Sequence, residues 1–96
     1  MSTLNAPPPF VERLIHALDA QLKDVGIEAK IDSEPVGGTT KLYRIYVIAG
    51  GFEPLGHSER QGLVWRIADR TLSPAEQIKI SMILTLTPAE CEPNGG

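Results

Sequence analysis

Apolar residues recur three and four positions apart in the first third of the chain. Between Phe10 and Val25 this spacing places them on one side of a helix, with charged residues on the other sides. The apolar set is Val11, Leu14, Ile15, Leu18, Leu22 and Val25. Pro9 suits the first helical position, and Gly26 suits the residue that ends a helix. The pattern predicts an amphipathic helix over residues 10–25.

The period of the apolar positions then changes to two. Ile27, Ala29 and Ile31 alternate with charged residues, which predicts a half-buried edge strand over 27–34. Residues 41–49 are rich in β-branched and aromatic side chains and predict the strongest strand. Its two faces carry Tyr43, Ile45 and Val47 on one side and Leu42, Arg44, Tyr46 and Ile48 on the other. Segment 35–40 contains Gly37 and Gly38 and predicts a turn, so we expect an antiparallel hairpin.

Two cap signals follow the hairpin. Ser58 and Gln61 have the spacing of a capping box, which predicts that a second helix begins after Ser58 and ends near Arg70. The buried stripe of this helix is expected to be Leu63, Val64, Ile67 and Ala68. Ser73 and Glu76 repeat the signal with Pro74 between them, which predicts a short helix or turn.

Segment 78–87 fits two structures. Helical spacing of Ile78, Met82, Ile83 and Leu86 suits a helix that continues from the preceding cap, whereas strict alternation from Ile78 to Leu86 suits a strand. The isoleucines and threonines favour the strand, which we place from about Lys79. Thr87 to Glu90 repeats the cap pattern and predicts a terminal turn.

The order of elements is therefore α-β-β-α-(α)-β. It predicts an α+β fold, with a three-stranded mixed sheet and helices packed on one face. The other face is open to solvent or used by a partner. We expect one domain over 10–90, a flexible proline-rich segment over 1–9 and a disordered tail over 91–96.

Composition limits the classes of function. The chain has 96 residues and 42% hydrophobic residues, which is enough for one core. Its net charge of -3 disfavours general phosphate binding but leaves room for a local basic patch. Cys91 is the single cysteine, which excludes an intrachain disulfide and fits a reducing compartment. No apolar run reaches the ~20 residues of a membrane span, and the first ten residues do not form a secretory signal. We expect a cytoplasmic protein.

Several short motifs resemble those of a known family. Phe52 to Leu55 forms a turn, Arg60 to Trp65 carries a basic residue, an apolar pair and an aromatic residue, and Thr87 to Glu90 reads Thr-Pro-Ala-Glu. In this order the motifs resemble BolA-like proteins, whose fold is related to type II KH domains. The resemblance implies a non-enzymatic interaction domain, and it implies a monothiol glutaredoxin as one partner.

The chain departs from the family pattern at its basic and metal-binding positions. Gln61 and Gly62 replace the histidine and arginine of the basic cluster, and Lys79 replaces the last-strand histidine. A protonated lysine has no lone pair to offer a metal. We therefore expect protein binding with no metal and no cofactor.

The candidate partner-binding residues are His57, Glu59, Arg60 and Lys79. Each has a simpler alternative explanation. For His57 we favour the simpler explanation of an exposed loop histidine, and Arg60 is equally consistent with a solvated helix arginine that pairs with Glu59 or Glu53. For Lys79 we favour a strand lysine that opposes aggregation.

Two other functions stay open. Arg44, Tyr46 and Lys79 on an uncovered sheet face would bind single-stranded nucleic acid weakly by stacking and charge, although the Gly-x-x-Gly loop of a KH domain is missing. The chain is otherwise a monomer, or a homodimer formed by pairing strand edges. We expect no enzyme, because His16 and His57 lack ligand spacing and no catalytic constellation is present.

Overall fold

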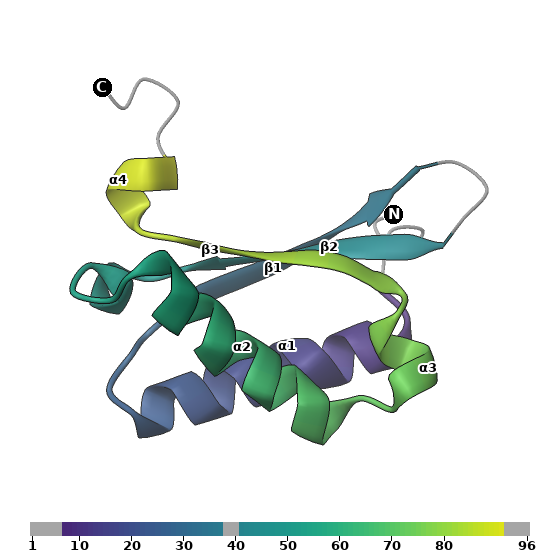
Figure 1. The fold of residues 1–96 in the computed structure, drawn as a ribbon. Coiled ribbons are helices and arrows are strands. Elements are labelled where there is room, and N and C mark those ends of the chain that lie inside the picture. The colour runs from purple at the N-terminus through teal and green to yellow at the C-terminus, as the bar shows by residue number, and fades with distance from the viewer. Residues whose placement is uncertain (1–6, 38–40, 92–96) are drawn as a thin grey trace.

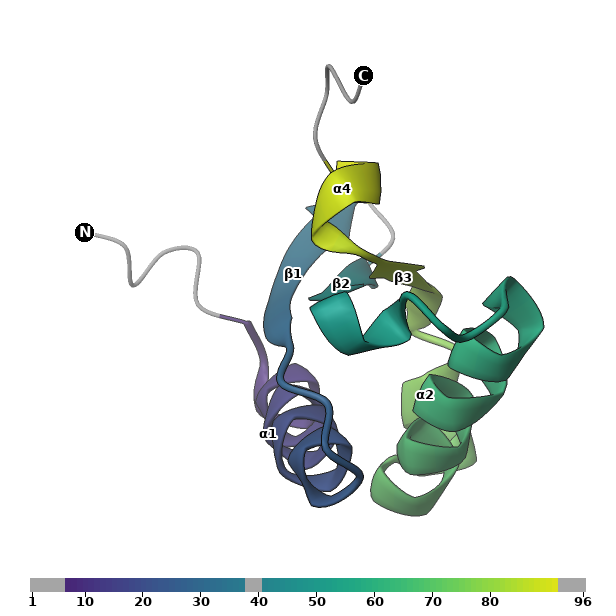
Figure 2. The ribbon, with the colours of Figure 1, turned by 90° about the vertical axis from the view of Figure 1, so that its left-hand side faces the viewer.

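Two helices lie side by side beneath one face of a three-stranded sheet (Figures 1 and 2). The structure is a computed structural model that describes residues 7–37 and 41–91. The elements are α1 (Pro9–Asp24), β1 (Lys30–Val36), β2 (Leu42–Ile48), η2 (Gly50–Phe52), α2 (His57–Thr71), α3 (Pro74–Gln77), β3 (Ile80–Leu86) and α4 (Pro88–Cys91). This order confirms the predicted α+β fold with a mixed sheet.

The strands are arranged in the order β1-β2-β3. β1 and β2 are antiparallel, which confirms the predicted hairpin, and β2 and β3 are parallel. A parallel pair needs a crossover connection, which α2 and α3 supply. β2 is therefore the central strand, and β1 and β3 are the two edges of the sheet.

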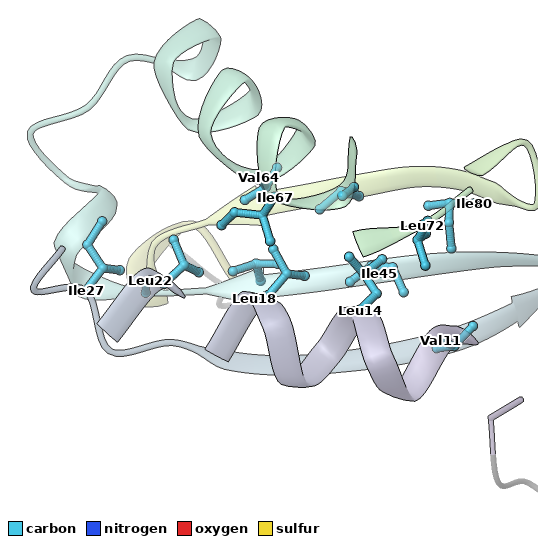
Figure 3. Packing of buried hydrophobic residues seen from close by; sticks show 14 of the residues in the cluster. Val11, Leu14, Leu18, Leu22, Ile27, Ile45, Val64, Ile67, Leu72 and Ile80 are labelled. Atoms are coloured by element: carbon cyan, nitrogen blue, oxygen red, sulfur yellow. The ribbon is translucent and has the colours of Figure 1, made fainter. Parts of the chain in front are cut away.

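The predicted faces of β2 are confirmed. Ile45 and Val47 are buried on the side that faces α1 and α2, opposite Ile83 and Thr85 of β3. Figure 3 shows Ile45 above the apolar side chains of α1. The core of the molecule lies between this face of the sheet and the two long helices.

The apolar face of α1 is confirmed except at its last position. Val11, Leu14, Leu18 and Leu22 are fully buried, as Figure 3 shows for the packing of α1. The prediction that Val25 belongs to this face is wrong, because Val25 follows the end of the helix and is 59% exposed.

Gly26 ends α1 as predicted. Its φ is 82°, in the left-handed region that glycine adopts without strain. The Gly26 N–H donates to the Lys23 carbonyl at 2.9 Å and the Ile27 N–H donates to the Leu22 carbonyl at 2.8 Å, which together form a Schellman motif. The motif turns the chain so that Ile27 packs back into the core.

β1 begins later than predicted. The sequence pattern placed the strand over 27–34, but it runs from Lys30 to Val36. Ile27 is buried as part of the helix-ending turn and not as a strand residue. Pro35 lies within the edge strand, where its missing N–H costs no ladder hydrogen bond. Gly37 of the predicted turn has a φ of 80°, in the region that glycine adopts without strain, and Gly38 lies outside the described residues.

The predicted start of the second helix is wrong. α2 begins at His57, with Gly56 at the N-cap position. The carboxylate of Glu59 accepts a hydrogen bond from the Gly56 N–H at 2.8 Å, so Glu59 closes the first turn. Ser58 therefore lies inside the helix, and Gln61 is free to bond elsewhere. The predicted stripe is confirmed at Val64, Ile67 and Ala68, which are buried, and Leu63 packs partly against the core.

The cap of α3 and the strand assignment of β3 are confirmed. The Glu76 N–H donates to Ser73 Oγ at 3.2 Å, and the Ser73 N–H donates to a Glu76 carboxylate oxygen at 3.0 Å. The prediction that buried and exposed residues alternate strictly through β3 is wrong, because the register between β2 and β3 shifts near the start of β3. Ile80 and Ile83 consequently both face the helices, while Ile78 precedes the strand and is 76% exposed.

The chain continues into α4 at the end of β3. Thr87 and Glu90 bond reciprocally between backbone N–H and side chain, at 3.0 and 3.2 Å, which confirms this predicted cap. Cys91 is exposed and ends α4, and residues 92–96 of the tail predicted over 91–96 lie outside the described part. Of the segment predicted over 1–9, residues 1–6 lie outside it as well. None of the described helices is long and apolar enough to cross a membrane.

Candidate functional site

One face of the sheet carries no long helix. Within the described residues, only α4 stands on this side, at the end of β3, while α1 and α2 lie on the other side (Figure 1). We call this side the open face. The strand register assigns it Lys30, Asp32, Glu34, Val36, Leu42, Arg44, Tyr46, Ile48, Met82, Leu84 and Leu86.

Polar and apolar side chains separate across the open face. β1 contributes charged residues at three of its four positions, whereas β3 contributes only aliphatic side chains. We call Leu42, Ile48, Met82, Leu84 and Leu86 the apolar stripe. Met82 is 43% exposed, and the other four are half-buried. The open face thus carries aliphatic side chains along β3 and at the two ends of β2.

The polar groups of β2 turn away from this strip. Tyr46 Oη donates to a carboxylate oxygen of Glu34 on β1 at 2.5 Å. Arg44 Nη1 lies 3.3 Å from Tyr46 Oη and 3.4 Å from the same Glu34 oxygen. The pKa of Arg44 is raised, chiefly by its hydrogen bond with Tyr46. The three side chains therefore bond one another across β1 and β2 without a partner.

The edge of β1 resists pairing with another strand. Tyr43 and Ala49 of β2 donate their N–H groups to β3, so the even-numbered residues of β2 bond β1. The backbone N–H and C=O groups of the odd-numbered residues of β1 therefore point away from the sheet. The Ser33 N–H is bonded by Asp32 Oδ1 at 3.0 Å, and Pro35 has no N–H. The outer side of β1 therefore has little left to donate.

The edge of β3 is occupied by two side chains of α2. Gln61 Nε2 donates to the Ile83 carbonyl at 2.8 Å, and Arg60 Nη1 donates to the Thr85 carbonyl at 3.2 Å. Gln61 in turn accepts from the indole N–H of Trp65 at 3.1 Å. These contacts remove the two carbonyl groups that an added strand would use.

Arg60 is an interior residue. It is 7% exposed, and its Nε donates to the carbonyls of Phe52 and Leu55, both at 3.1 Å. Its Nη1 donates to the Thr85 carbonyl and, at 2.9 Å, to a carboxylate oxygen of Glu90. Its guanidinium carbon also lies 5.7 Å from the centre of the Phe52 ring. Arg60 therefore joins the turn before α2, the strand β3 and α4.

The alternative explanation of Arg60 as a solvated arginine that pairs with Glu59 or Glu53 is wrong, because Arg60 forms its ion pair with Glu90. The charge of Arg60 is already neutralised inside the molecule, which leaves it little to offer a phosphate or a partner carboxylate. The hydrogen bond from Arg60 and then the Thr87 N–H lower the pKa of Glu90 below its usual range.

The other predicted partner-binding residues lie in two places. His57 and Glu59 are exposed on the first turn of α2. Lys79 precedes β3, with its Nζ 5.6 Å from the centre of the Phe10 ring. Phe10 packs edge-on against Tyr43, on the helix-facing side of the sheet. The four residues do not form one surface.

The residues of the nucleic-acid alternative are also separated. Arg44 and Tyr46 lie on the open face and bond Glu34, whereas Lys79 lies over Phe10. A carboxylate within the cluster opposes phosphate binding. Weak nucleic-acid binding stays a prediction, but the geometry does not favour it.

Sequence reasoning missed two residues that organise this region. Gln61 was assigned to a cap but bridges α2 and β3, and Glu90 was assigned to a cap but also holds Arg60. Over residues 7–37 and 41–91, no group of three or more His, Cys, Asp or Glu side chains could hold a metal ion, and no buried side-chain polar atom lacks a hydrogen bond.

Comparison of the chain with protein-family models, curated proteins and solved structures gives no match.

Proposed function

We propose that the chain is a small non-enzymatic protein-binding domain whose contact surface is the open face. The apolar stripe is the observation that carries this proposal. Met82 is 43% exposed, and four further aliphatic side chains, all half-buried, lie on the same face. A contiguous exposed apolar patch beside polar residues is typical of a protein-interaction surface.

Energetics support the same surface. Each square ångström of apolar area removed from water contributes about 25 cal/mol. Covering polar groups opposes binding unless they keep hydrogen bonds. On the open face, Arg44 and Tyr46 already bond Glu34, so a partner gains the apolar area without stranding these groups.

The proposal includes membership of the BolA-like family without its metal site. The order of elements and the mixed sheet are compatible with the fold that this resemblance implies. Lys79 stands at the position of the family's last-strand histidine, and its ammonium lies over the Phe10 ring. We therefore propose partner binding with no metal or cofactor.

The absence of a metal role is tested with a monothiol glutaredoxin that carries a [2Fe–2S] cluster. We expect the visible spectrum of the cluster to stay unchanged when the chain is added. A change of the kind that histidine ligation produces would remove this part of the proposal.

The surface itself is tested by site-specific cross-linking in the source cell. A photo-reactive phenylalanine analogue is placed at position 84 on the open face, and at position 78 as the control. Ile78 is aliphatic and 76% exposed but precedes β3, so it matches the chemistry without belonging to the face. We expect a discrete cross-linked protein from position 84 and none from position 78. Equal products from both positions, or none from position 84, would remove the proposed function.

A further inference from the structure

We propose that the partner contributes an amphipathic α-helix, which lies along β3 and covers the apolar stripe. This inference rests on the proposed function and specifies the chemistry of the partner. The occupied strand edges, the dimensions of the stripe and the charge balance of the open face carry it.

The strand edges favour a partner that binds the face. An added strand needs unpaired N–H and C=O groups along an edge. Gln61 and Arg60 hold the carbonyls of Ile83 and Thr85, and Pro35 has no N–H to donate on the β1 side. A partner that approaches from above the sheet meets neither obstruction.

The length of the stripe fits one helix. β3 has seven residues and is therefore about 23 Å long, and the stripe is about 5 Å wide along β3 and widens onto β2 only at Leu42 and Ile48. A helix is about 10 Å in diameter, and about 15 residues span this length. Side chains four positions apart on a helix repeat every ~6 Å, close to the ~6.6 Å between alternate residues of a strand. A helix aligned with β3 can therefore place successive side chains between Met82, Leu84 and Leu86.

The opposite face of the same sheet already packs in this manner. Leu14 and Leu18 of α1 lie in one buried cluster with Ile45 of β2 (Figure 3). A helix on the open face would complete a layer of helices on both sides of the sheet, which is a common way to bury two apolar sheet faces.

The area argues against a second copy of the chain as the occupant. Three strands of this length make a face of about 14 Å by 23 Å, or roughly 320 Å². A stable interface buries about 800 Å² on each partner. Two open faces placed together fall short of this area, so this face does not form a stable dimer by itself, and a helix that covers only the stripe binds weakly by the same measure.

Charge on the open face is balanced. Lys30 and Arg44 provide two cations, and Asp32 and Glu34 provide two carboxylates. We therefore expect the affinity for the helix to depend little on ionic strength, in contrast to a phosphate-bearing ligand. The polar side of the helix would face the charged residues of β1.

The probe is a synthetic peptide of about 15 residues, with leucines three and four positions apart and equal numbers of lysine and glutamate. The control peptide has the same composition with its leucines scrambled. The full chain, isotope-labelled, is titrated with each peptide, and chemical shifts and peptide circular dichroism are recorded. We expect the amphipathic peptide to shift the resonances of Met82, Leu84 and Leu86 and to gain helicity, and the scrambled peptide to do neither.

Two variants test whether the peptide binds at the apolar stripe. Met82→Lys removes an exposed aliphatic side chain from the stripe, and Ile78→Lys removes one from outside it. We expect Met82→Lys to weaken the affinity for the amphipathic peptide by about tenfold or more, and Ile78→Lys to change that affinity by less than about twofold. Met82→Ala is the milder second variant, and all three are compared with the wild type for folding by circular dichroism.

Three results would overturn the inference. One is equal binding of both peptides, and another is a dimer in light scattering that Met82→Lys abolishes, which would make a second copy the occupant. The third is a partner segment cross-linked at position 84 that is extended and not helical. That third result would leave the proposed protein-binding function intact, whereas the lack of any cross-link at position 84 would remove the function itself.

Discussion

Arg60 lies at the helical spacing of the buried side of α2, four residues before Val64. That position explains why its guanidinium is directed inward, toward the carbonyls of Phe52, Leu55 and Thr85. Charge alone suggested a surface residue. The spacing relative to Val64 was the available sign that the side chain belongs to the interior.

Replacement of Arg60 by alanine tests this interior role. We expect Arg60→Ala to lower the free energy of unfolding by about 3 kcal/mol or more, because three carbonyls and the Glu90 carboxylate lose a donor. Urea denaturation measures the change. Arg66→Ala, at an exposed position of the same helix, is the control and should cost under about 0.5 kcal/mol. Similar values for the two variants would place Arg60 at the surface.

Glu90 gives the fold a dependence on pH. Its pKa is lowered in the folded state, first by the hydrogen bond from Arg60 and then by the Thr87 N–H. A lowered folded pKa stabilises the protein above the unfolded pKa, and the stabilisation is lost as the pH falls through the folded value. We expect the melting temperature to fall below about pH 5. Glu90→Gln should make that fall shallower, and an unchanged slope would contradict the ion pair. Glu76, whose pKa Ser73 and Arg13 lower, contributes in the same direction in both proteins.

At the scale of elements, the end of α1 depends on the conformation of one residue. Gly26 has a φ of 82°, where a side chain is strained even though no atom lies within 4 Å of an added Cβ. We expect Gly26→Ala to cost about 1 kcal/mol and Gly26→Asn to cost less, since asparagine tolerates this region better. Thermal unfolding measures both. Equal stability of Gly26→Ala and the wild type would mean that the helix does not end in a Schellman motif.

The edge of β1 carries its own protection against self-association. We expect the double variant Asp32→Ala, Pro35→Val to associate as its concentration rises, because it restores N–H groups that can pair with another strand. Light scattering against concentration measures this, with Glu28→Ala as a control at an exposed residue before β1. A double variant that scatters like the wild type would show that these two residues do not protect the edge.

Most elements could be predicted because apolar periodicity sets which side is buried. The hairpin, both long helices and the faces of β2 follow from it. The start of α2 could not, because Glu59 bonds the Gly56 N–H where Ser58 offered an equally good cap signal. The shift in β3 could not be predicted either, because Ile80 and Ile83 both turn toward the helices only once β2 is their neighbour.

The surface was harder to predict than the fold. The order of elements predicted an uncovered sheet face, but the division of that face into polar and apolar halves depends on contacts between strands. Glu34 attracts both Arg44 and Tyr46 only because β1 and β2 pair in this register. The candidate residues from the loop before α2 were chosen by charge and family resemblance, which do not report burial.

At the scale of the whole molecule, the sheet has one apolar side, a second side that is partly apolar, and only one set of long helices. α1 and α2 cover the first side (Figure 1), and on the second side Met82 of the stripe is 43% exposed. On β1 the Ser33 N–H is bonded and Pro35 has no N–H, and on β3 the carbonyls of Ile83 and Thr85 are bonded, so we propose the open face as the binding surface of the described part of the chain.

The most direct measurement of that claim is the affinity of the partner cross-linked at position 84, purified and titrated against three forms of the chain by isothermal calorimetry. We expect Met82→Lys to lose about 1.5 kcal/mol or more, which is about tenfold in Kd, and Ile78→Lys to bind like the wild type. Equal affinities for Met82→Lys and the wild type would contradict the assignment of the open face as the binding surface.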